Sequence, residues 1–316
     1  VNCSATAARM IAAHFTPEML ADYPNVDGVV AFVHGTGCGM AGDGDGFEAL
    51  QRVMWGYARH PNHAGVLMVG LGCEMNQIDW LLEAYGLKQG PLFQSMNIQS
   101  VAGLRRTVEK GIEKVAAMLP LANQAQREPC PASEVKVALQ CGGSDAWSGI
   151  TANPALGYAT DLLVAQGGTG VLAETPEIYG AEHLLPARAV DQATGRRLRA
   201  RGFTFMDSPG YDPASVTGQS AGGCNLVCFT TGRVSAFGSK PSPTIKVATN
   251  TEMYGRMIED MDVNAGAMLS DGVSLEEKGR EIYELFLRVA SGEMSKSEAQ
   301  GLGDYEFVPW QIGAVM

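Results

Sequence analysis

The sequence contains few charged residues and no long apolar run. Only 18% of its 316 residues are Asp, Glu, Lys or Arg, whereas 46% are hydrophobic. No stretch of about 18 consecutive apolar residues occurs, and the chain shows no charged-then-apolar leader of the secretory kind. These absences predict a globular protein of the cytoplasm that does not cross a membrane.

Positive charge is also scarce. The chain has 23 Lys and Arg against 34 Asp and Glu, which gives a formal net charge of -11 at pH 7. This balance repels nucleic acid and anionic lipid, and no basic stripe with interleaved aromatic residues opposes it. We therefore expect a small-molecule ligand and neither a nucleic-acid nor a membrane partner. An acidic ligand would need a local cation, and Arg233 and Lys240, which lie near glycines in loops, are the candidates.

The cysteines are too few, and odd in number, for a disulfide framework. The chain has seven of them, and we expect them to be thiols. Free cysteine usually behaves as a small hydrophobic residue. Packing or surface positions are therefore expected for Cys3, Cys130, Cys224 and Cys228.

Glycine is abundant, with 39 residues, and short apolar runs alternate with amphipathic stretches. This order predicts an α/β fold with two lobes of largely parallel sheet flanked by helices, built from Rossmann-like βαβ units. We place a first α/β lobe at 1–120, a linker at 121–134, and a second α/β lobe with a C-terminal helix and tail at 135–316. Strands are expected in GVVAFVH, AGVLMVGLG, PLFQSMN, VKVALQCGG, TGVLAE, GFTFMDSPG, NLVCFTTG and TIKVATN, and helices near 47–59, 76–86, 100–118, 154–166, 181–199 and 273–290.

Thiols and an imidazole lie where these strands are expected to end. Parallel sheets bind their ligands at the carboxyl ends of strands, so these positions mark a candidate site. Soft donors of this kind suit iron, manganese or zinc. The candidate metal ligands are His34, Cys38, Cys73 and Cys141. The alternative is that each cysteine is a small residue in a tight turn between a strand and a helix.

Carboxylates and hydroxyl groups lie at the same expected strand ends. The acid and base candidates, which the sequence alone does not rank, are Glu74, Asp145, Glu174 and Glu177. The stretch QCGGSDAWSGITANPALG supplies polar groups for a polyhydroxylated ligand, namely Ser144, Ser148, Thr151 and Asn153. For Thr151 and Asn153, capping of the following helix is an equal alternative.

The segment HGTGCGMAGDGDG has the G-x-G-x-x-G spacing of a dinucleotide-binding loop. Asp43 and Asp45, however, would repel a pyrophosphate, and Cys38 lies in the middle of the cradle. We therefore expect a loop for a metal and a substrate in place of a nucleotide cradle.

Six motifs taken together resemble the catalytic region of the altronate/galactarate dehydratase family of sugar-acid dehydratases, and the resemblance runs essentially from Val1 to Met316. They are HGTGCGM, GLGCEMN, QCGGSDAWSGITANPALG, ETPEIYGAEHLL, GGCNLVCFTTGR and EFVPWQIGAVM. The resemblance implies a metal-dependent hydro-lyase, with Fe²⁺ or alternatively Mn²⁺, that converts an aldonate or aldarate to a 2-keto-3-deoxy acid. Members commonly carry an N-terminal SAF-type domain, which here would be separate or trimmed. They also have a further lysine-bearing stretch between Arg201 and GFTFMDSPG, which this sequence lacks.

Such a dehydration requires a base for the proton α to the carboxylate, a cation to hold the developing enediolate, and an acid for the departing hydroxyl. We expect the metal to act as a Lewis acid, with Arg233 and Lys240 holding the substrate carboxylate. One alternative uses the same cysteines as ligands of an iron–sulfur cluster with an open iron. Another is a non-catalytic sugar-acid binding subunit of a split dehydratase. We further expect a homodimer.

Overall fold

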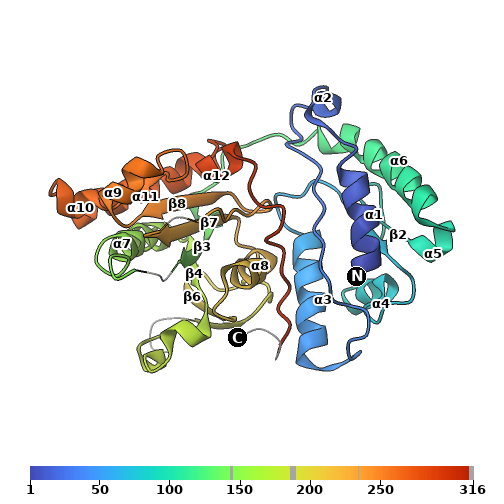
Figure 1. The fold of residues 1–316 in the computed structure, drawn as a ribbon, viewed down its shortest axis with the longest axis horizontal. Helices are drawn as coiled ribbons and strands as arrows, with labels where there is room; N and C mark the ends of the chain where they lie inside the picture. Colours follow the sequence, from blue (N-terminus) through green and yellow to red (C-terminus); the bar gives the residue numbers. More distant parts are fainter. Residues whose placement is uncertain (143–144, 186–189, 234, 313–316) are drawn as a thin grey trace. The chain divides into compact units, whose positions relative to one another are not determined.

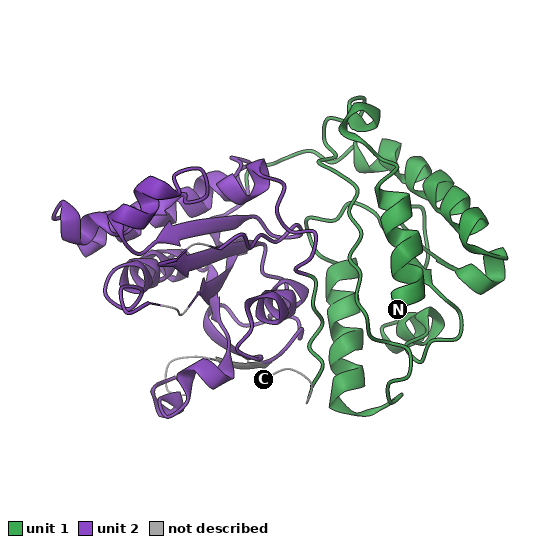
Figure 2. Cartoon of the chain, viewed as in Figure 1, with its two compact units in different colours: residues 1–129, 307–312 green, residues 130–306, 313–316 purple. Residues whose placement is uncertain are grey.

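The computed structural model describes residues 1–142, 145–185, 190–233 and 235–312 (Figure 1). The chain divides into two compact units (Figure 2): unit 1 comprises Val1–Pro129 with Phe307–Ile312, and unit 2 comprises Cys130–Glu306. Residues 307–312 thus group with unit 1, whereas the sequence places them in the second lobe. No helix within the described residues is both long enough and apolar enough to span a membrane.

Unit 1 contains a parallel pair of strands, β1 (Val66–Gly70) and β2 (Phe93–Asn97), in which Val66 pairs with Phe93 and Gly70 with Asn97. Helix α1 packs closely on α6 at Gly111, which has no side chain. A Cβ at this position would lie only 2.3 Å from Ile11 Cδ1 of α1. The helices of the unit are α1 (Asn2–Ala12), α2 (Pro17–Leu20), α3 (Gly44–Ala58), α4 (Ile78–Ala84), α5 (Ile98–Val101) and α6 (Leu104–Ala122).

The expected strand GVVAFVH is wrong. Residues 28–34 form no strand, although Val29 packs against the cluster around Ile11 and Met96. An apolar run becomes a strand only when a neighbour completes its backbone ladder, and the described residues give this run no pairing partner. Its apolar side chains still contribute to the core of unit 1.

Unit 2 contains a seven-stranded, wholly parallel sheet in the order β5-β6-β4-β3-β7-β8-β9. Side chains alternate between its two faces. Val137 and Leu139 pack with α7 and α11, whereas Ala138 packs with the cluster that contains Val216 of α8. Both faces are therefore covered, as parallel sheets require. The strands are β3 (Lys136–Cys141), β4 (Thr169–Leu172), β5 (Val190–Ala193), β6 (Gly202–Asp207), β7 (Leu226–Thr231), β8 (Thr244–Ala248) and β9 (Val263–Asn264).

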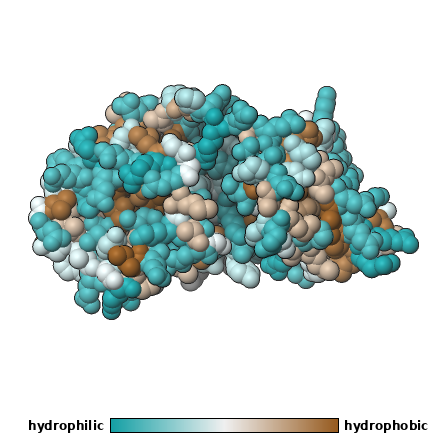
Figure 3. Space-filling model, turned by 90° about the horizontal axis from the view of Figure 1, so that it is seen from above, coloured by the Kyte–Doolittle hydropathy of each residue, from teal (hydrophilic) through white to brown (hydrophobic). Residues whose placement is uncertain are grey.

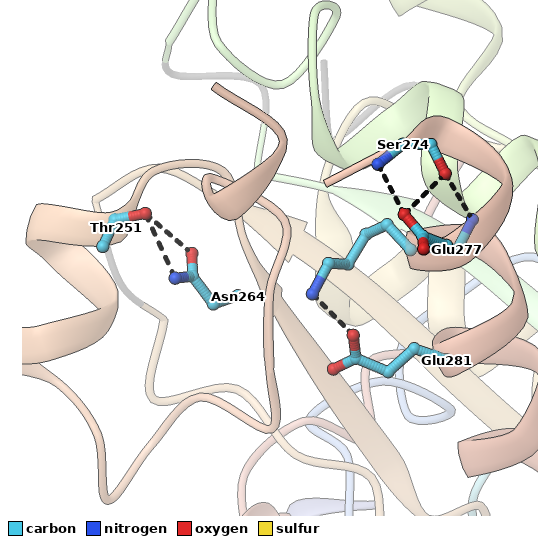
Figure 4. Close-up of polar contacts among 6 residues, drawn as sticks. Thr251, Asn264, Ser274, Glu277 and Glu281 are labelled. Atoms are coloured by element: carbon cyan, nitrogen blue, oxygen red, sulfur yellow. Dashed lines mark hydrogen bonds and ion pairs between the residues drawn. The ribbon is translucent and has the colours of Figure 1, made fainter. Parts of the chain in front are cut away.

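The helices of unit 2 are α7 (Ala152–Ala165), α8 (Asp212–Gly222), α9 (Thr251–Arg256), α10 (Ala267–Ser270), α11 (Leu275–Ala290) and α12 (Lys296–Ala299). Helix α11 begins with a capping box, in which Ser274 Oγ accepts from Glu277 N at 3.2 Å (Figure 4). One turn later, Lys278 donates to Glu281 at 2.5 Å. Thr251 at the start of α9 contacts Asn264 of β9, which fixes this edge of the sheet (Figure 4).

The expected helix near 181–199 is also wrong. Short 3₁₀ turns occur at Thr175–Ile178 and Glu182–Leu184, and β5 then pairs in parallel with β6. Sheet pairing thus overrides the helical composition of this stretch, a common outcome for weak local preferences. The predicted α/β class, with parallel sheets flanked by helices, is confirmed. On the face that Figure 3 displays, hydrophilic residues cover most of the surface and hydrophobic ones form small groups.

Candidate active site

The strands of unit 2 all run in one direction, so their carboxyl ends share one edge of the sheet. Glu174 follows β4, Cys141 ends β3 and Arg233 follows β7, and these strands are neighbours in the order β4-β3-β7. Two interstrand spacings of about 4.8 Å therefore separate the ends of β4 and β7. Ligands of open parallel sheets bind at this edge, and we treat it as the candidate site.

Glu174 has an unusual backbone conformation at this edge. Its φ is 71°, in the left-handed region, and the residue is only 6% exposed. This conformation costs a residue with a Cβ about 1–2 kcal/mol. Ser208 contacts the strained segment twice, since its Oγ accepts from Glu174 N at 3.0 Å and its carbonyl accepts from Thr175 N at 3.1 Å. Strain of this kind in a buried carboxylate is typical of functional sites.

The carboxyl group of Glu174 holds its proton unusually tightly. Burial above all, followed by the negative charges of Asp212, Glu177 and Cys141, raises the pKa of Glu174, and a hydrogen bond from the Tyr211 backbone partly opposes this rise. The resulting pKa is about 8. At neutral pH the group is therefore mainly protonated and can donate a proton.

Asp212 is a second perturbed carboxyl group, and the sequence reasoning missed it. It is the first residue of α8, followed by Pro213, and burial together with the charge of Glu177 raises its pKa to about 6. The dipeptide Asp-Pro at a helix start was a usable signal. Above pH 6 this carboxylate is ionised and more basic than an ordinary aspartate.

Asp145 is held by three hydrogen bonds. Its Oδ1 accepts from Ser148 N and from Ser148 Oγ, both at 2.9 Å, and its Oδ2 accepts from Thr249 Oγ1 at 2.9 Å. Only glycine fits at position 232, because a Cβ there would lie 1.1 Å from Asp145 Oδ2. The carboxylate thus links the segment after β3 to the end of β8. Ser144 lies outside the described residues.

Thr151 and Asn153 also connect the ends of strands. Thr151 Oγ1 donates to Thr249 O at 2.7 Å, and its N-cap position shows no side-chain capping bond. Asn153 Oδ1 accepts from Thr230 Oγ1 at 2.6 Å, and Asn153 Nδ2 lies 3.5 Å from Cys141 Sγ. Asn153 therefore orients the partly exposed Cys141 thiol at the end of β3.

The two predicted substrate cations differ in their surroundings. Lys240 Nζ lies 2.5 Å from Asp304 Oδ1, so a carboxylate of the protein already neutralises it. Arg233 is exposed just after β7 and has no ion-pair partner among the described residues. Arg233 is therefore the better candidate for a substrate carboxylate.

Glu177 lies exposed in the 3₁₀ turn Thr175–Ile178 of unit 2, just after Glu174. The other predicted residues lie in unit 1. Two loops meet there, since Met75 N donates to Gly37 O at 2.8 Å. Glu74 is 4% exposed and accepts from Leu71 N at 2.8 Å and from Gly72 N at 2.5 Å, so its carboxylate holds its own turn.

The side chains offered as metal ligands in these loops have varied surroundings. Cys38 and Cys73 are exposed, and Gln99 Nε2 donates to Cys73 Sγ at 3.2 Å. Burial lowers the pKa of His34 to about 4, which keeps its imidazole neutral at physiological pH. A neutral imidazole is the form that ligates metals.

The predicted metal ligands are divided between the units. His34, Cys38 and Cys73 belong to unit 1, whereas Cys141 belongs to unit 2. Within the described part of the chain, no group of three His, Cys, Asp or Glu residues is arranged to hold a metal ion. Within each unit taken alone, the described donors therefore form no metal-holding set.

Comparisons with known proteins cover nearly the whole chain. The family model "D-galactarate dehydratase/Altronate hydrolase, second domain" matches residues 1–123, and "D-galactarate/Altronate dehydratase, C-terminal" matches 132–201 and 193–315. The chain is 32% identical to altronate dehydratase of Bacillus subtilis, over 94% of this chain and 71% of that protein. It is 33% identical to galactarate dehydratase (L-threo-forming) of Escherichia coli, over 77% of this chain and 59% of that protein.

A further relative is the (2R)-sulfolactate sulfo-lyase subunit beta of Chromohalobacter salexigens, at 28% identity over 90% of this chain and 87% of the relative. The alignment with the Bacillus protein extends over 363 residues, which is more than the 316 of this chain. That relative therefore contains residues without a counterpart here. The C-terminal family model matches in two separate pieces that overlap at residues 193–201. This break lies next to Arg201, where the lysine-bearing stretch of the family was expected and is not found in the sequence.

Proposed function

The chain belongs to the D-galactarate/altronate dehydratase family, and we propose on this basis that it is a hydro-lyase that removes water from an aldonate or aldarate to give a 2-keto-3-deoxy acid. The strongest support is the state of Glu174, whose buried carboxyl group is mainly protonated at neutral pH. Glu174 also lies at the carboxyl ends of the strands, where open parallel sheets bind their ligands. Loss of a hydroxyl group requires a proton donor of this kind.

The proposed roles follow from the environments of three side chains. Arg233 binds the substrate carboxylate through its guanidinium fork. Asp212, ionised above pH 6, removes the proton from the carbon next to that carboxylate. The electron pair of the broken C–H bond forms a carbon–carbon double bond as the C–O bond at the adjacent carbon breaks. Glu174 gives its proton to the departing hydroxyl, which leaves as water.

The resulting enol takes up a proton at carbon 3 and loses the proton of its hydroxyl group at carbon 2, which gives the 2-keto acid, so the net change is the loss of one water molecule. The two carboxyl groups differ in pKa, which is about 8 for Glu174 and about 6 for Asp212. At a pH between these values, one site therefore contains both a protonated acid and an ionised base. Asp145, with its three hydrogen bonds, acts here as a structural link between strand ends.

Turnover of a substrate panel tests the proposed function. The full chain is incubated with altronate, galactarate and (2R)-sulfolactate, each with and without ferrous iron, and formation of keto acid is measured. We expect turnover of at least one of the two sugar acids. Absence of turnover with both, in either condition, would contradict the proposal.

A second candidate function is favoured by one comparison. The chain covers 87% of a sulfo-lyase subunit beta, more than of the altronate dehydratase, and this relative is by its name one part of a larger enzyme. A chain of this kind would bind the acid and need a separate subunit for turnover. Saturable binding of a panel acid without keto acid formation would support this alternative.

Metal dependence, with Fe²⁺ or Mn²⁺, stays a prediction, as does the iron–sulfur alternative. If the thiols ligate a metal, Cys73→Ala and Cys141→Ala each lower the metal bound per chain while the free energy of unfolding changes little, because neither thiol is buried. Metal analysis of anaerobically purified variants measures this, with Cys130→Ala, another exposed cysteine, as the control. Equal metal content in all four proteins would favour a packing role for the cysteines.

A further inference from the structure

A buried polar network links α8 to strands β3 and β4. Gln219 Nε2 donates to Val171 O at 2.7 Å, and Gln219 Oε1 accepts from Gln140 Nε2 at 3.1 Å. Gln140 Nε2 also donates to Ser215 Oγ at 2.6 Å. The side chains of these four residues lie inside the unit, with exposed fractions of 2% or less.

The orientation of each amide in this network is determined by its neighbours. The Val171 carbonyl only accepts, so Gln219 must present its NH₂ group there and its oxygen to Gln140. Gln140 must therefore present its own NH₂ group, and its Oε1 is left without a hydrogen-bond partner among the described residues. An unpaired buried oxygen destabilises a fold, and an apolar side chain would avoid the cost. The network is thus better explained by what it holds in place than by stability.

The group that it holds is the hydroxyl of Ser208. Ser208 Oγ lies 3.2 Å from Ser215 Oγ and accepts from Glu174 N at 3.0 Å. Ser208 is 1% exposed, and its carbonyl accepts from Thr175 N, so one residue holds two successive peptide groups. The hydrogen bonds therefore lead from Val171 of β4 back to Glu174, three residues later in the chain.

We propose that Ser208 is a positioning residue, which keeps Glu174 in its left-handed conformation with the carboxyl group beside Asp212 and the Tyr211 backbone, and that Ser215, Gln140 and Gln219 orient Ser208. This inference rests on the proposed role of Glu174 as the acid. Without the Ser208 hydroxyl, the Glu174 N–H is unpaired and the backbone is free to relax to an ordinary conformation. That relaxation turns the carboxyl group away from the substrate.

Ser208→Ala tests the inference in the full chain. We expect kcat to fall about 10- to 100-fold with KM changed less than about threefold, because misplacing a proton donor slows the chemical step and not binding. Ser220→Ala is the matched control, since Ser220 is an equally buried serine of α8 whose hydroxyl contacts Ser242 outside the network. Its kcat should stay within about twofold of the wild type.

A double-mutant cycle shows whether Ser208 acts through Glu174. In a Glu174→Gln background, Ser208→Ala should lower kcat no further, because the positioned group is already absent. An undiminished kcat in Ser208→Ala, or an equal loss in both backgrounds, would overturn the inference. If Ser208→Ala does not fold, Ser215→Ala replaces it in both backgrounds. We then expect kcat to fall about 3- to 10-fold in the wild-type background and no further in the Glu174→Gln background.

A readout that needs no turnover separates this inference from the proposed function. The titration of Glu174, followed by NMR in protein labelled with ¹³C-glutamate, should move toward that of an ordinary glutamate in Ser208→Ala and stay unchanged in Ser220→Ala. If the wild type turns over no sugar acid and this shift still occurs, positioning stands and the proposed function fails. If Ser208→Ala leaves the titration unchanged, positioning by Ser208 is wrong whatever the activity.

Discussion

Replacing Glu174 with glutamine lowers kcat by about 10²- to 10⁴-fold and changes KM little, because glutamine keeps the shape of the neutral carboxyl group but has no acidic proton to give to the departing hydroxyl. Steady-state kinetics on the substrate turned over best measure this. Glu177→Gln is the comparison, since it removes a carboxylate from an exposed position three residues away. A larger loss in Glu177→Gln than in Glu174→Gln would reassign the proton donor.

The stability of Glu174→Gln shows whether the variant is folded and whether the pKa of Glu174 is raised. Between about pH 4.5 and pH 8 the folded chain keeps the Glu174 proton while the unfolded chain loses it, so the free energy of unfolding of the wild type falls as pH rises through this window. Glutamine does not titrate. Glu174→Gln should therefore match the wild type below pH 4.5 and exceed it by about 2–4 kcal/mol at pH 9. Urea unfolding at several pH values measures the difference, and parallel pH profiles would contradict the assignment.

Replacing Arg233 with lysine raises KM about 10- to 100-fold although the charge is conserved, because an ammonium group does not reproduce the two parallel hydrogen bonds of a guanidinium to a carboxylate. Arg233 is exposed and has no ion-pair partner within the described ranges, so its replacement should leave the free energy of unfolding nearly unchanged. Substrate-dependence curves at constant ionic strength give KM.

Lys240→Met and Arg256→Lys serve as the comparisons for Arg233. Lys240 already pairs with Asp304, and Arg256 pairs with Glu252 on the surface of α9, so neither should raise KM more than about threefold. A KM increase that is greatest in Lys240→Met would place the substrate carboxylate at Lys240 instead.

Much of the fold follows from local patterns in the sequence. The runs VKVALQCGG, NLVCFTTG and TIKVATN are apolar enough to be buried on both faces, and they form β3, β7 and β8 as expected. The family motifs are long and ordered, and the resemblance that they indicated is confirmed by matches along most of the chain. Glu174, Glu177 and Arg233 were found because parallel strands place the residues that follow them at one edge.

Helix α8 was missed because its own preferences are weak. Its sequence DPASVTGQSAG is rich in serine, threonine and glycine, which favour helices little, yet all residues from Ala214 to Gly222 are buried against the sheet. Packing of that face stabilises the helix where local preference does not. With α8 the sequence reasoning also missed Asp212 and Ser215, two of the groups that surround or support Glu174.

The sequence by itself determined the α/β class, the family and the set of reactive side chains at strand ends, because apolar periodicity and ordered motifs are local properties of the chain. Only the tertiary structure ranked those side chains. Glu74 and Asp145 are occupied by hydrogen bonds, whereas Glu174 is buried near other carboxylates and keeps its proton. Burial, backbone strain at a φ of 71° and the repulsion among Glu174, Glu177 and Asp212 arise from segments that meet only when the sheet is assembled, so no local pattern in the sequence contains them.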